Sequence, residues 1–436
     1  MNHIISTLIG KTIHNDDSMN TNTTLNNNVM TEKKEKNKYL FCFLYLLVIL
    51  CFTFLPFRLR LSFINDTVLY VFGVTVSLMA AYSFIRTRRF VFAFIYAGVI
   101  IFNFFLKNNI NLGNSLAESF NILCTAFMAH YLLKNIDMGK CRWFSIVFIA
   151  LVAVYAISTF GFYLVFPGVM RFAAMRENFD RALPFFLRGL SPYAFPHALT
   201  CVIPAMVMGL KIHDQSTTKK VLCAATLALS LVLIYITQAT GALIAAVFAL
   251  VCSIVSKVDV FRKNSRRLIW VSIFILPFAL SDSLQLSFLQ GVGEFVGSES
   301  HYAYKIEEME ESITSEGETS GDINYRGNLL ELTMKAIATH PLFGVTDNRD
   351  YGHHNALPDR WALYGIIGFL PLILYFFYQV KYTLRIIPIQ HQTFYLIGVA
   401  TNFLMLLSKD MLSWYQLYCF IVMLPVMTLY FGNTNK

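Results

Sequence analysis

The stretch FSIVFIALVAVYAISTFGFYLVFP, Phe144–Pro167, decides the fold class, because it contains no charged residue. About 20 apolar residues form a helix long enough to cross a hydrocarbon core roughly 30 Å thick. A second run, Tyr39–Phe57, has the same character. Strands that span a membrane would instead alternate apolar and polar residues over about ten positions. The pattern therefore predicts membrane-spanning helices.

The composition of the whole chain agrees with a membrane protein. Of its 436 residues, 56% are hydrophobic and 14% are charged, whereas soluble domains carry about 25% charged residues. The net charge of +9 comes from basic clusters between apolar runs, which indicates membrane topology and excludes nucleic acid as an expected partner. Residues 1–38 are polar and lack the features of a signal peptide, so we expect a disordered cytoplasmic tail. Translation could begin at Met1 or at Met30.

Apolar runs and helix breakers divide the rest of the chain into twelve expected spans. They lie near residues 39–57, 66–85, 90–106, 116–133, 144–166, 193–210, 221–236, 240–256, 267–281, 361–380, 391–408 and 412–431. The predicted fold class is an all-α polytopic membrane protein with about 12 transmembrane helices and one large periplasmic loop.

The distribution of Lys and Arg predicts the orientation, because cytoplasmic segments carry the excess of basic residues. With the N-terminus inside, cytoplasmic segments hold 22 Lys and Arg and outer segments hold 13. An even number of spans returns the C-terminus to the cytoplasm as well. The domains expected are the tail 1–38, spans one to nine in 39–281, the periplasmic loop 282–359, and the last three spans in 360–436.

Two outer segments break the charge bias. Nine of the 13 outer basic residues lie in them: Arg171, Arg176, Arg181 and Arg188 in the 167–190 loop, and Lys305, Arg326, Lys335, Arg349 and Arg360 in the segment that begins at 282. Long loops escape the charge rule in any case, which is one explanation. The other is an anion site on the outer face.

The loop 282–359 divides into two halves of different character. The first half is rich in glutamate, without the regular Asp/Asn spacing of a calcium loop, and reads as a solvated acidic loop. The eight cysteines show no CxxC spacing, so we expect neither a metal site nor a cofactor; instead they should serve as small apolar residues in helices. In the second half, helical spacing of Leu329, Leu330, Met334 and Ile337 predicts a helix over Tyr325–Thr339 that Pro341 ends.

Four short motifs follow one another in this second half. They are Arg326, the turn Pro341-Leu-Phe-Gly344, the segment Gly352-His-His-Asn355, and Tyr364-Gly-Ile-Ile-Gly368 at the start of a span. This order resembles the signature region of the O-antigen ligase and O-antigen polymerase superfamily. The spacing from His354-Asn355 to Gly365 and Gly368 matches that of the superfamily, and so do the number of spans and the position of the large loop.

The resemblance implies a GT-C-like glycosyltransferase of the bacterial inner membrane that works at the periplasmic face. Its donor would be an undecaprenyl-diphosphate-linked oligosaccharide, used without a metal. The expected partners are that oligosaccharide, membrane lipid, and a flippase and chain-length regulator of the same pathway. One departure stands out: relatives often carry Ser-Arg-Gly-Ala where this chain has Ala239-Thr-Gly-Ala242. Arg181, Arg188 or Arg326 would then have to replace the missing arginine.

The candidate site residues make chemical sense of this activity. Arginine binds phosphate oxygens bidentately, so Arg188 and Arg326 are the candidates that clamp the diphosphate and stabilise its departure. His354 is the candidate that orients or deprotonates the acceptor hydroxyl. The supporting substrate-binding candidates are Arg176, Arg181, His353 and Asn355.

Other residues in or beside the spans are not assigned to the catalytic site. Gly365 and Gly368 are expected to permit close helix packing under the site rather than to contact substrate. Glu118, His130 and His197 could line a cavity, since ionisable groups within a membrane mark functional positions.

Three functions remain open from the sequence. A repeat-unit polymerase is favoured because the residues of the Gly352–Asn355 and Tyr364-Gly365 motifs resemble those of polymerases more closely. The alternative is the ligase that transfers the finished glycan to lipid A core. A polysaccharide transporter or flippase is the third, although the paired internal repeats and interrupted helices of that class are not visible in the sequence.

Overall fold

The computed structural model describes residues 40–61, 66–134, 136–175, 178–258, 322–353, 355–409 and 412–433, together with Gln290, Ala303, Ile306, Glu307 and Glu310. The side chains of Asp66, residues 322–326 and Ser408 fall outside this description. So do the predicted tail 1–38, the ninth expected span 267–281, and most of the acidic half of the large loop.

The named secondary structure of the described residues is entirely helical. In chain order the elements are α2 (Leu55–Arg60), α3 (Asp66–Ala81), η1 (Tyr82–Arg86), α4 (Arg88–Leu106), α5 (Leu112–Leu133), α6 (Met138–Val165), α7 (Val169–Ala174), α8 (Phe179–Leu187), α9 (Ala194–Leu199), η3 (Thr200–Val202), α10 (Ile203–Lys211), α11 (Thr217–Ile236), α12 (Thr240–Val255), α16 (Asp322–Thr339), α17 (Ala356–Ile386), η4 (Ile389–His391), α18 (Gln392–Ser408), α19 (Trp414–Leu417), η5 (Tyr418–Met423) and α20 (Leu424–Gly432).

Eight helices of the described part are long and apolar enough to cross a membrane. They are Thr67–Arg86, Arg88–Leu106, Leu112–Leu133, Met138–Val165, Ala194–Lys211, Thr217–Ile236, Ala356–Ile386 and Trp414–Gly432. Two shorter apolar helices, Leu40–Thr53 and Thr240–Val255, match the first and eighth expected spans, and α18 matches the eleventh. The all-helical membrane class is confirmed, and the count of twelve stays a prediction.

Polar caps decide where several helices begin. The Thr87 hydroxyl accepts a hydrogen bond from Phe90 N at 3.2 Å before α4, and the Asp137 carboxylate accepts one from Gly139 N at 2.9 Å before α6. Such caps satisfy N–H groups that the first turn of a helix leaves open. Because of the cap at Asp137, α6 begins six residues before the apolar run that starts at Phe144.

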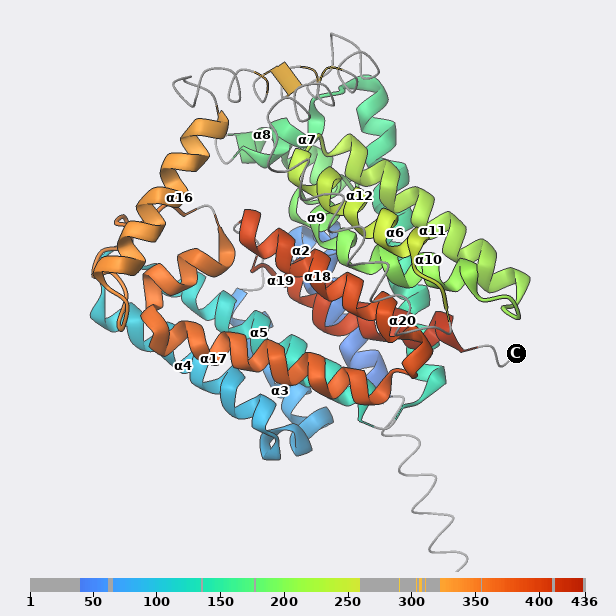
Figure 1. Cartoon of the computed structure of the whole chain (residues 1–436), viewed down its shortest axis with the longest axis horizontal. Coiled ribbons are helices and arrows are strands. Elements are labelled where there is room, and N and C mark those ends of the chain that lie inside the picture. Colours follow the sequence, from blue (N-terminus) through green and yellow to red (C-terminus); the bar gives the residue numbers. More distant parts are fainter. Residues whose placement is uncertain are drawn as a thin grey trace, which may run out of the picture. The chain divides into compact units, whose positions relative to one another are not determined.

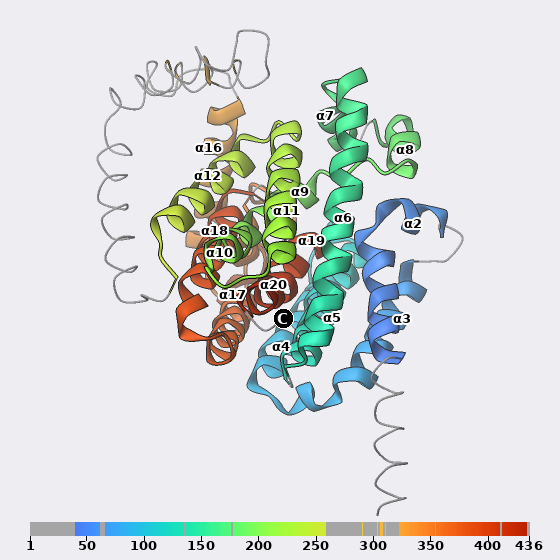
Figure 2. The same cartoon turned by 90° about the vertical axis from the view of Figure 1, so that its right-hand side faces the viewer.

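The helices that position the candidate site form a connected set. In Figure 1, α4 lies beside α17, and it packs against both α17 and α5. The helix α18 packs against α17, α10 and α12. Figure 2 shows α11 beside α6, and α10 also packs against α11 and α20. The helix α17 is therefore packed against helices from both earlier and later parts of the chain.

The contacts between helix ends agree with the prediction that successive connections lie alternately on the inner and outer sides of the membrane. Two connections expected on the outer face meet where Asn108 N donates to Thr346 O at 3.1 Å. Ends expected on the inner face meet where Arg89 donates to the Gln379 side chain at 2.9 Å. Each pair joins segments that the charge count places on the same side. This agreement supports the alternation, and which side is periplasmic stays a prediction.

The eight cysteines are all free thiols, and seven of them are buried. They lie in helices, as the sequence predicted. Buried free cysteine behaves as a small apolar residue. No cysteine crosslinks the helices.

Candidate active site

A break in α17 lies at the centre of the motif region. Gly365 has φ 62° and ψ −173°, a conformation inside an otherwise helical run that only glycine adopts readily. A methyl group at this position would also overlap the carbonyl of Leu342. Gly365 therefore serves a close approach of two backbone segments, which corrects the expectation of simple helix packing.

The turn Pro341–Val345 lies in this break and satisfies the backbone groups that the break leaves open. Ile366 N and Ile367 N would bond to Ala362 and Leu363 in a regular helix. They donate instead to Pro341 O at 2.8 Å and to Leu342 O at 3.4 Å. The freed carbonyl of Ala362 accepts from Val345 N at 2.9 Å. The turn motif and Gly365 are thus two halves of one backbone joint.

Lys107 completes this joint from α4. Its ammonium donates to the remaining free carbonyl, Leu363 O, and to Phe343 O at 2.8 Å. Burial lowers the pKa of Lys107 to about 8. Gly344, with φ 73°, leaves no room for a side chain against the Leu363 carbonyl. Lys107 has no motif around it, and sequence reasoning gave it no role.

Gly368 behaves as the sequence predicted. A methyl group there would lie 3.0 Å from Cγ1 of Val99 in α4 and would also overlap Cβ of Tyr364 in its own helix. A glycine at this position therefore lets α17 approach α4 closely. The two glycines of the Gly-x-x-Gly motif have different tasks, a backbone joint at Gly365 and helix packing at Gly368.

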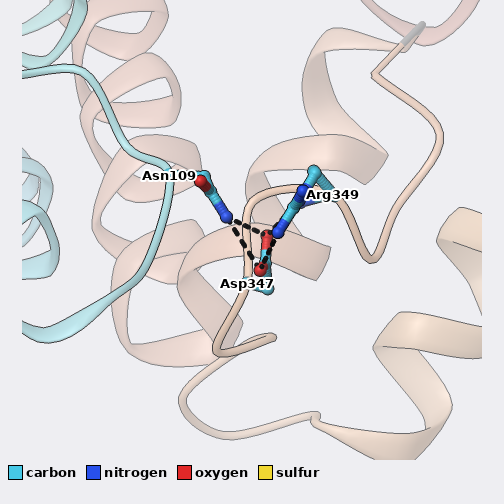
Figure 3. Close-up of polar contacts among 3 residues, drawn as sticks. All are labelled: Asn109, Asp347 and Arg349. Carbon is cyan, nitrogen blue, oxygen red and sulfur yellow. Dashed lines mark hydrogen bonds and ion pairs between the residues drawn. The ribbon is translucent and has the colours of Figure 1, made fainter.

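The loop after the turn is fastened to the α4–α5 connection. Figure 3 shows the Asp347 carboxylate between Asn109 and Arg349. Asn109 Nδ2 donates to Oδ1 and Oδ2 of Asp347 at 2.9 and 2.8 Å, and the Arg349 guanidinium lies 3.2 Å from Oδ2. Hydrogen bonds from the Arg349 side chain and N–H, and from Asn109, hold the pKa of Asp347 far below its usual range. Arg349, one of the nine basic residues of the outer loops, is therefore paired with a carboxylate.

The Gly352–Asn355 segment is held at both ends by a buried network. Gly352 N donates to the Thr333 hydroxyl at 2.9 Å, and that hydroxyl donates to Asp359 Oδ1 at 2.8 Å. Asn355 N donates to the other carboxylate oxygen of Asp359 at 2.6 Å. Asp359 is fully buried. One carboxylate therefore links α16, the segment that contains the histidines, and the first turn of α17.

Within the Gly352–Asn355 segment, His353 is exposed and Asn355 is buried. His353 is exposed, has φ 55°, and its ring centroid lies 3.8 Å from that of Tyr351. Asn355 precedes α17 and its side chain is buried. His354 lies outside the described residues. Its two neighbours are described, and the hydrogen-bonded positions Gly352 and Asn355 enclose it.

The helix predicted over Tyr325–Thr339 is confirmed, and α16 begins three residues earlier, at Asp322. Its buried side differs in part from the expected apolar positions. Ile337 is buried, but Leu330 and Met334 are 40% and 53% exposed, while Thr333 is buried. The spacing rule failed here because the polar Thr333 takes the inner position through its bonds to Gly352 and Asp359. Arg326 lies in α16, and its side chain falls outside the described part.

The arginines of the first basic loop lie around α8. Arg181 and Arg188 are both exposed, and Arg176 is outside the described residues. Arg188 ends α8, where Leu190 N donates to Phe185 O and Gly189 adopts φ 100°. This is a Schellman motif, which fixes the backbone after Arg188. The main packing partners of α8 are α2 and α7, whereas α16 packs against α17.

Arg360 is not available to bind an anion. Its guanidinium forms a two-pronged ion pair with Glu118 of α5, with distances of 3.0 and 3.1 Å, and both side chains are largely buried. The Tyr96 hydroxyl donates to the same carboxylate at 2.5 Å. Glu118 therefore fastens the start of α17 to α5. Buried in this pairing, it fits a structural role better than a cavity-lining one.

The two intramembrane histidines have different surroundings. The His130 ring lies 2.8 Å from the Arg89 guanidinium and 3.1 Å from the Ser83 hydroxyl, at the helix ends expected on the inner face. His197 is fully buried in α9, with Nδ1 2.9 Å from Tyr193 O. Its Nε2 has no hydrogen-bond partner. Of the two, only His197 has a ring nitrogen left for another group.

The helices and the jointed loop together define a polytopic membrane protein whose conspicuous feature is the α16–α17 region. Residues 225–401 of the chain match the O-antigen ligase family model. The match supports the O-antigen polymerase and ligase superfamily that the sequence motifs predicted. It includes the Gly352–Asn355 segment and Gly365, and it excludes Arg188. No curated protein gave a significant match.

Proposed function

We propose that this protein polymerises lipid-linked polysaccharide repeat units at the periplasmic face of the bacterial inner membrane. The superfamily match supports O-antigen polymerase or ligase activity and a membrane glycosyltransferase. The polymerase, the undecaprenyl-diphosphate-linked donor and independence from metal are the finer parts of the proposal.

One observation carries the proposal most strongly. Two motif positions near His354 are hydrogen-bonded to separate helices: Gly352 to Thr333 of α16, and Asn355 to Asp359 of α17. The backbone joint at Gly365 holds the turn Pro341–Val345 in α17, and the turn joins directly to the end of α16. Rigid placement of a catalytic group on supporting elements is what group transfer requires.

The proposed reaction is a single displacement at the anomeric carbon of the donor glycan. The acceptor hydroxyl oxygen bonds to that carbon while the bond from the carbon to the diphosphate oxygen breaks. The electron pair of the broken bond leaves with undecaprenyl diphosphate, and the hydroxyl proton passes to the His354 imidazole. A histidine suits this task because its pKa lies near neutrality.

Arginines would stabilise the departing diphosphate. Arg326 lies in α16, seven residues or about two helical turns before Thr333. Arg188 is exposed at a fixed backbone position. Arg176 and Arg181 would add positive charge to the same loop. With Arg349 and Arg360 paired to carboxylates, the remaining charge of the nine basic residues comes from these four arginines, from Arg171 and from the two lysines of the large loop.

The ligase remains a second candidate, because the matching family is described as O-antigen ligase. Both functions would use the same donor, so they differ in the acceptor beside His354. A polymerase accepts a second lipid-linked repeat unit there, and a ligase accepts lipid A core. The transporter hypothesis has no such support, because the matching family is described as a ligase and not as a transporter.

The glycan profile of a deletion strain separates these functions. Loss of a polymerase should leave surface lipid with a single repeat unit, because one unit can still be transferred to the core. We expect this pattern on a gel of extracted lipopolysaccharide, and we expect the wild-type gene to restore long chains.

Two other profiles would contradict the polymerase proposal. Bare core with long chains accumulated on undecaprenyl diphosphate would identify the ligase instead. Bare core without lipid-linked long chains would point to a transport defect.

A further inference from the structure

The turn Pro341–Val345 carries two large apolar side chains that are largely uncovered. Leu342 is 58% exposed and Phe343 is 70% exposed. Single apolar residues on a surface are common, whereas a contiguous apolar patch marks a surface that contacts something other than water. The neighbours of Leu342 and Phe343 therefore decide what these two side chains do.

Hydrogen bonds place the turn beside exposed apolar residues of two helices that are long and apolar enough to cross a membrane. Leu342 O accepts from Ile367 N of α17 at 3.4 Å, and Ile367 is 46% exposed. Phe343 O accepts from the ammonium of Lys107 at 2.8 Å. Lys107 directly follows Leu106, the last residue of α4, which is 63% exposed. Uncovered apolar residues from three segments are thus gathered at one place.

These residues continue the apolar surface of α4 and α17. In α4, exposed Phe105 precedes Leu106, and in α17, exposed Leu370 lies one turn after Ile367. Exposed apolar side chains on membrane-spanning helices contact the acyl chains of the bilayer. The turn lies at the end of α4 and in the break of α17, so its apolar side chains extend the surface that contacts lipid.

The backbone of the turn and of the break in α17 supplies an independent observation. Protein groups donate a hydrogen bond to each of the carbonyls at Pro341, Leu342, Phe343, Ala362 and Leu363. In water such carbonyls can bond to solvent. Lipid offers no donor, so irregular backbone at membrane depth persists only where protein groups satisfy it. The complete bonding of these carbonyls is therefore what a turn in lipid requires.

The charged residues that follow the turn limit its depth. Asp347, Arg349 and Asp350 come three to six residues after Gly344, and the last two are exposed. Charged side chains remain in water or among the lipid head groups. The tip of the turn therefore lies near the boundary between acyl chains and head groups, with the charged part of the loop outside it.

We propose that Leu342 and Phe343 insert into the bilayer leaflet next to the candidate site, where acyl chains cover them. The segment expected as a periplasmic loop is then anchored in lipid at this turn. The turn follows α16 directly and is bonded to α17, so its insertion fixes the height of the Gly352–Asn355 segment relative to the membrane surface. The contact is with the bilayer itself, whatever reaction the site performs.

Nitroxide labels on the full-length protein in phosphatidylcholine vesicles test this insertion. Cys42, the one cysteine that is not buried, is first replaced by serine, and single cysteines are then introduced. Electron paramagnetic resonance measures collisions of each label with oxygen, which concentrates among acyl chains, and with a water-soluble nickel chelate. We expect the label at Phe343→Cys to collide mainly with oxygen, like a label at Phe94→Cys, an exposed position within α4. Asp350→Cys, exposed on the same loop, is the matched control and should collide mainly with nickel.

Two results of the labelling would overturn the proposal. Nickel collisions as frequent at Phe343→Cys as at Asp350→Cys would place the turn in water. Few collisions with either reagent would mean that protein, such as a second copy of the chain, covers the turn. The vesicles contain no undecaprenyl lipid, so frequent oxygen collisions at Phe343→Cys would show contact with the bilayer and not with the chain of a substrate.

Thermal unfolding in the same vesicles provides a second measurement without a label. Phe343→Gln should lower the unfolding temperature, because it moves a polar amide into an apolar environment. Phe343→Trp should leave it unchanged, because tryptophan is favoured at the membrane boundary. On a turn in water, both substitutions would have little effect. An unchanged unfolding temperature in Phe343→Gln would therefore contradict the insertion.

Discussion

Glycan transfer should fall about 10²- to 10⁴-fold in His354→Ala, the range that general acid–base catalysis contributes, with the protein still present in the membrane. His354 holds the His-Asn register of the motif, and the motif positions Gly352 and Asn355 are hydrogen-bonded to Thr333 and Asp359. The measurement is the rate of chain extension by purified protein. The rate of the wild type should fall as the pH is lowered and the imidazole becomes protonated, because a protonated ring cannot accept the hydroxyl proton.

His353 provides the matched control. Its φ of 55° is unfavourable for alanine, so His353→Asn is the better substitution, since asparagine adopts this conformation more readily. We expect His353→Asn to keep most of the activity. Equal activity of the two variants, or equal loss in both, would remove His354 from its proposed role.

The Gly365→Ala variant should fold poorly or not at all. Alanine at φ 62° and ψ −173° costs about 1 to 3 kcal/mol in backbone strain. The overlap of its methyl group with the Leu342 carbonyl costs about 1 to 3 kcal/mol more. The joint between α17 and the turn Pro341–Val345 would then open. The measurement is the amount of monodisperse protein extracted from membranes and its unfolding temperature.

Gly98→Ala is the control for this substitution. Gly98 lies in α4, is exposed, and a methyl group there meets no atom within 4 Å. The change should leave the unfolding temperature the same or slightly higher, because alanine favours a helix. A Gly365→Ala protein as stable as Gly98→Ala would show that the joint does not have the described form.

The helices and the motif region could be predicted because their signals are local. Apolar runs gave the positions of the spans, and Pro341 gave the end of α16. Spacing alone identified Gly365 and Gly368 as positions without room for a side chain. It did not show that the Gly365 conformation serves a turn more than twenty residues earlier in the chain.

The residues that hold the site could not be predicted, because their contacts join distant segments. Thr333 and Asp359 are 26 residues apart, and Lys107 and Phe343 are 236 apart. An acidic residue at the start of an apolar helix was a signal for Asp359 that the sequence reasoning did not use. Nothing in the sequence distinguished the paired Arg349 and Arg360 from basic residues that remain available.

Reconstitution of the purified wild-type protein with a single undecaprenyl-diphosphate-linked repeat unit, in the presence of EDTA, is the most direct test of the proposed activity. The products are separated and weighed by mass spectrometry. We expect lipid-linked glycans of two or more units, with one undecaprenyl diphosphate released for each bond formed. A folded protein that forms no longer glycan and releases no undecaprenyl diphosphate, or that does so only with an added divalent metal, would contradict the proposal.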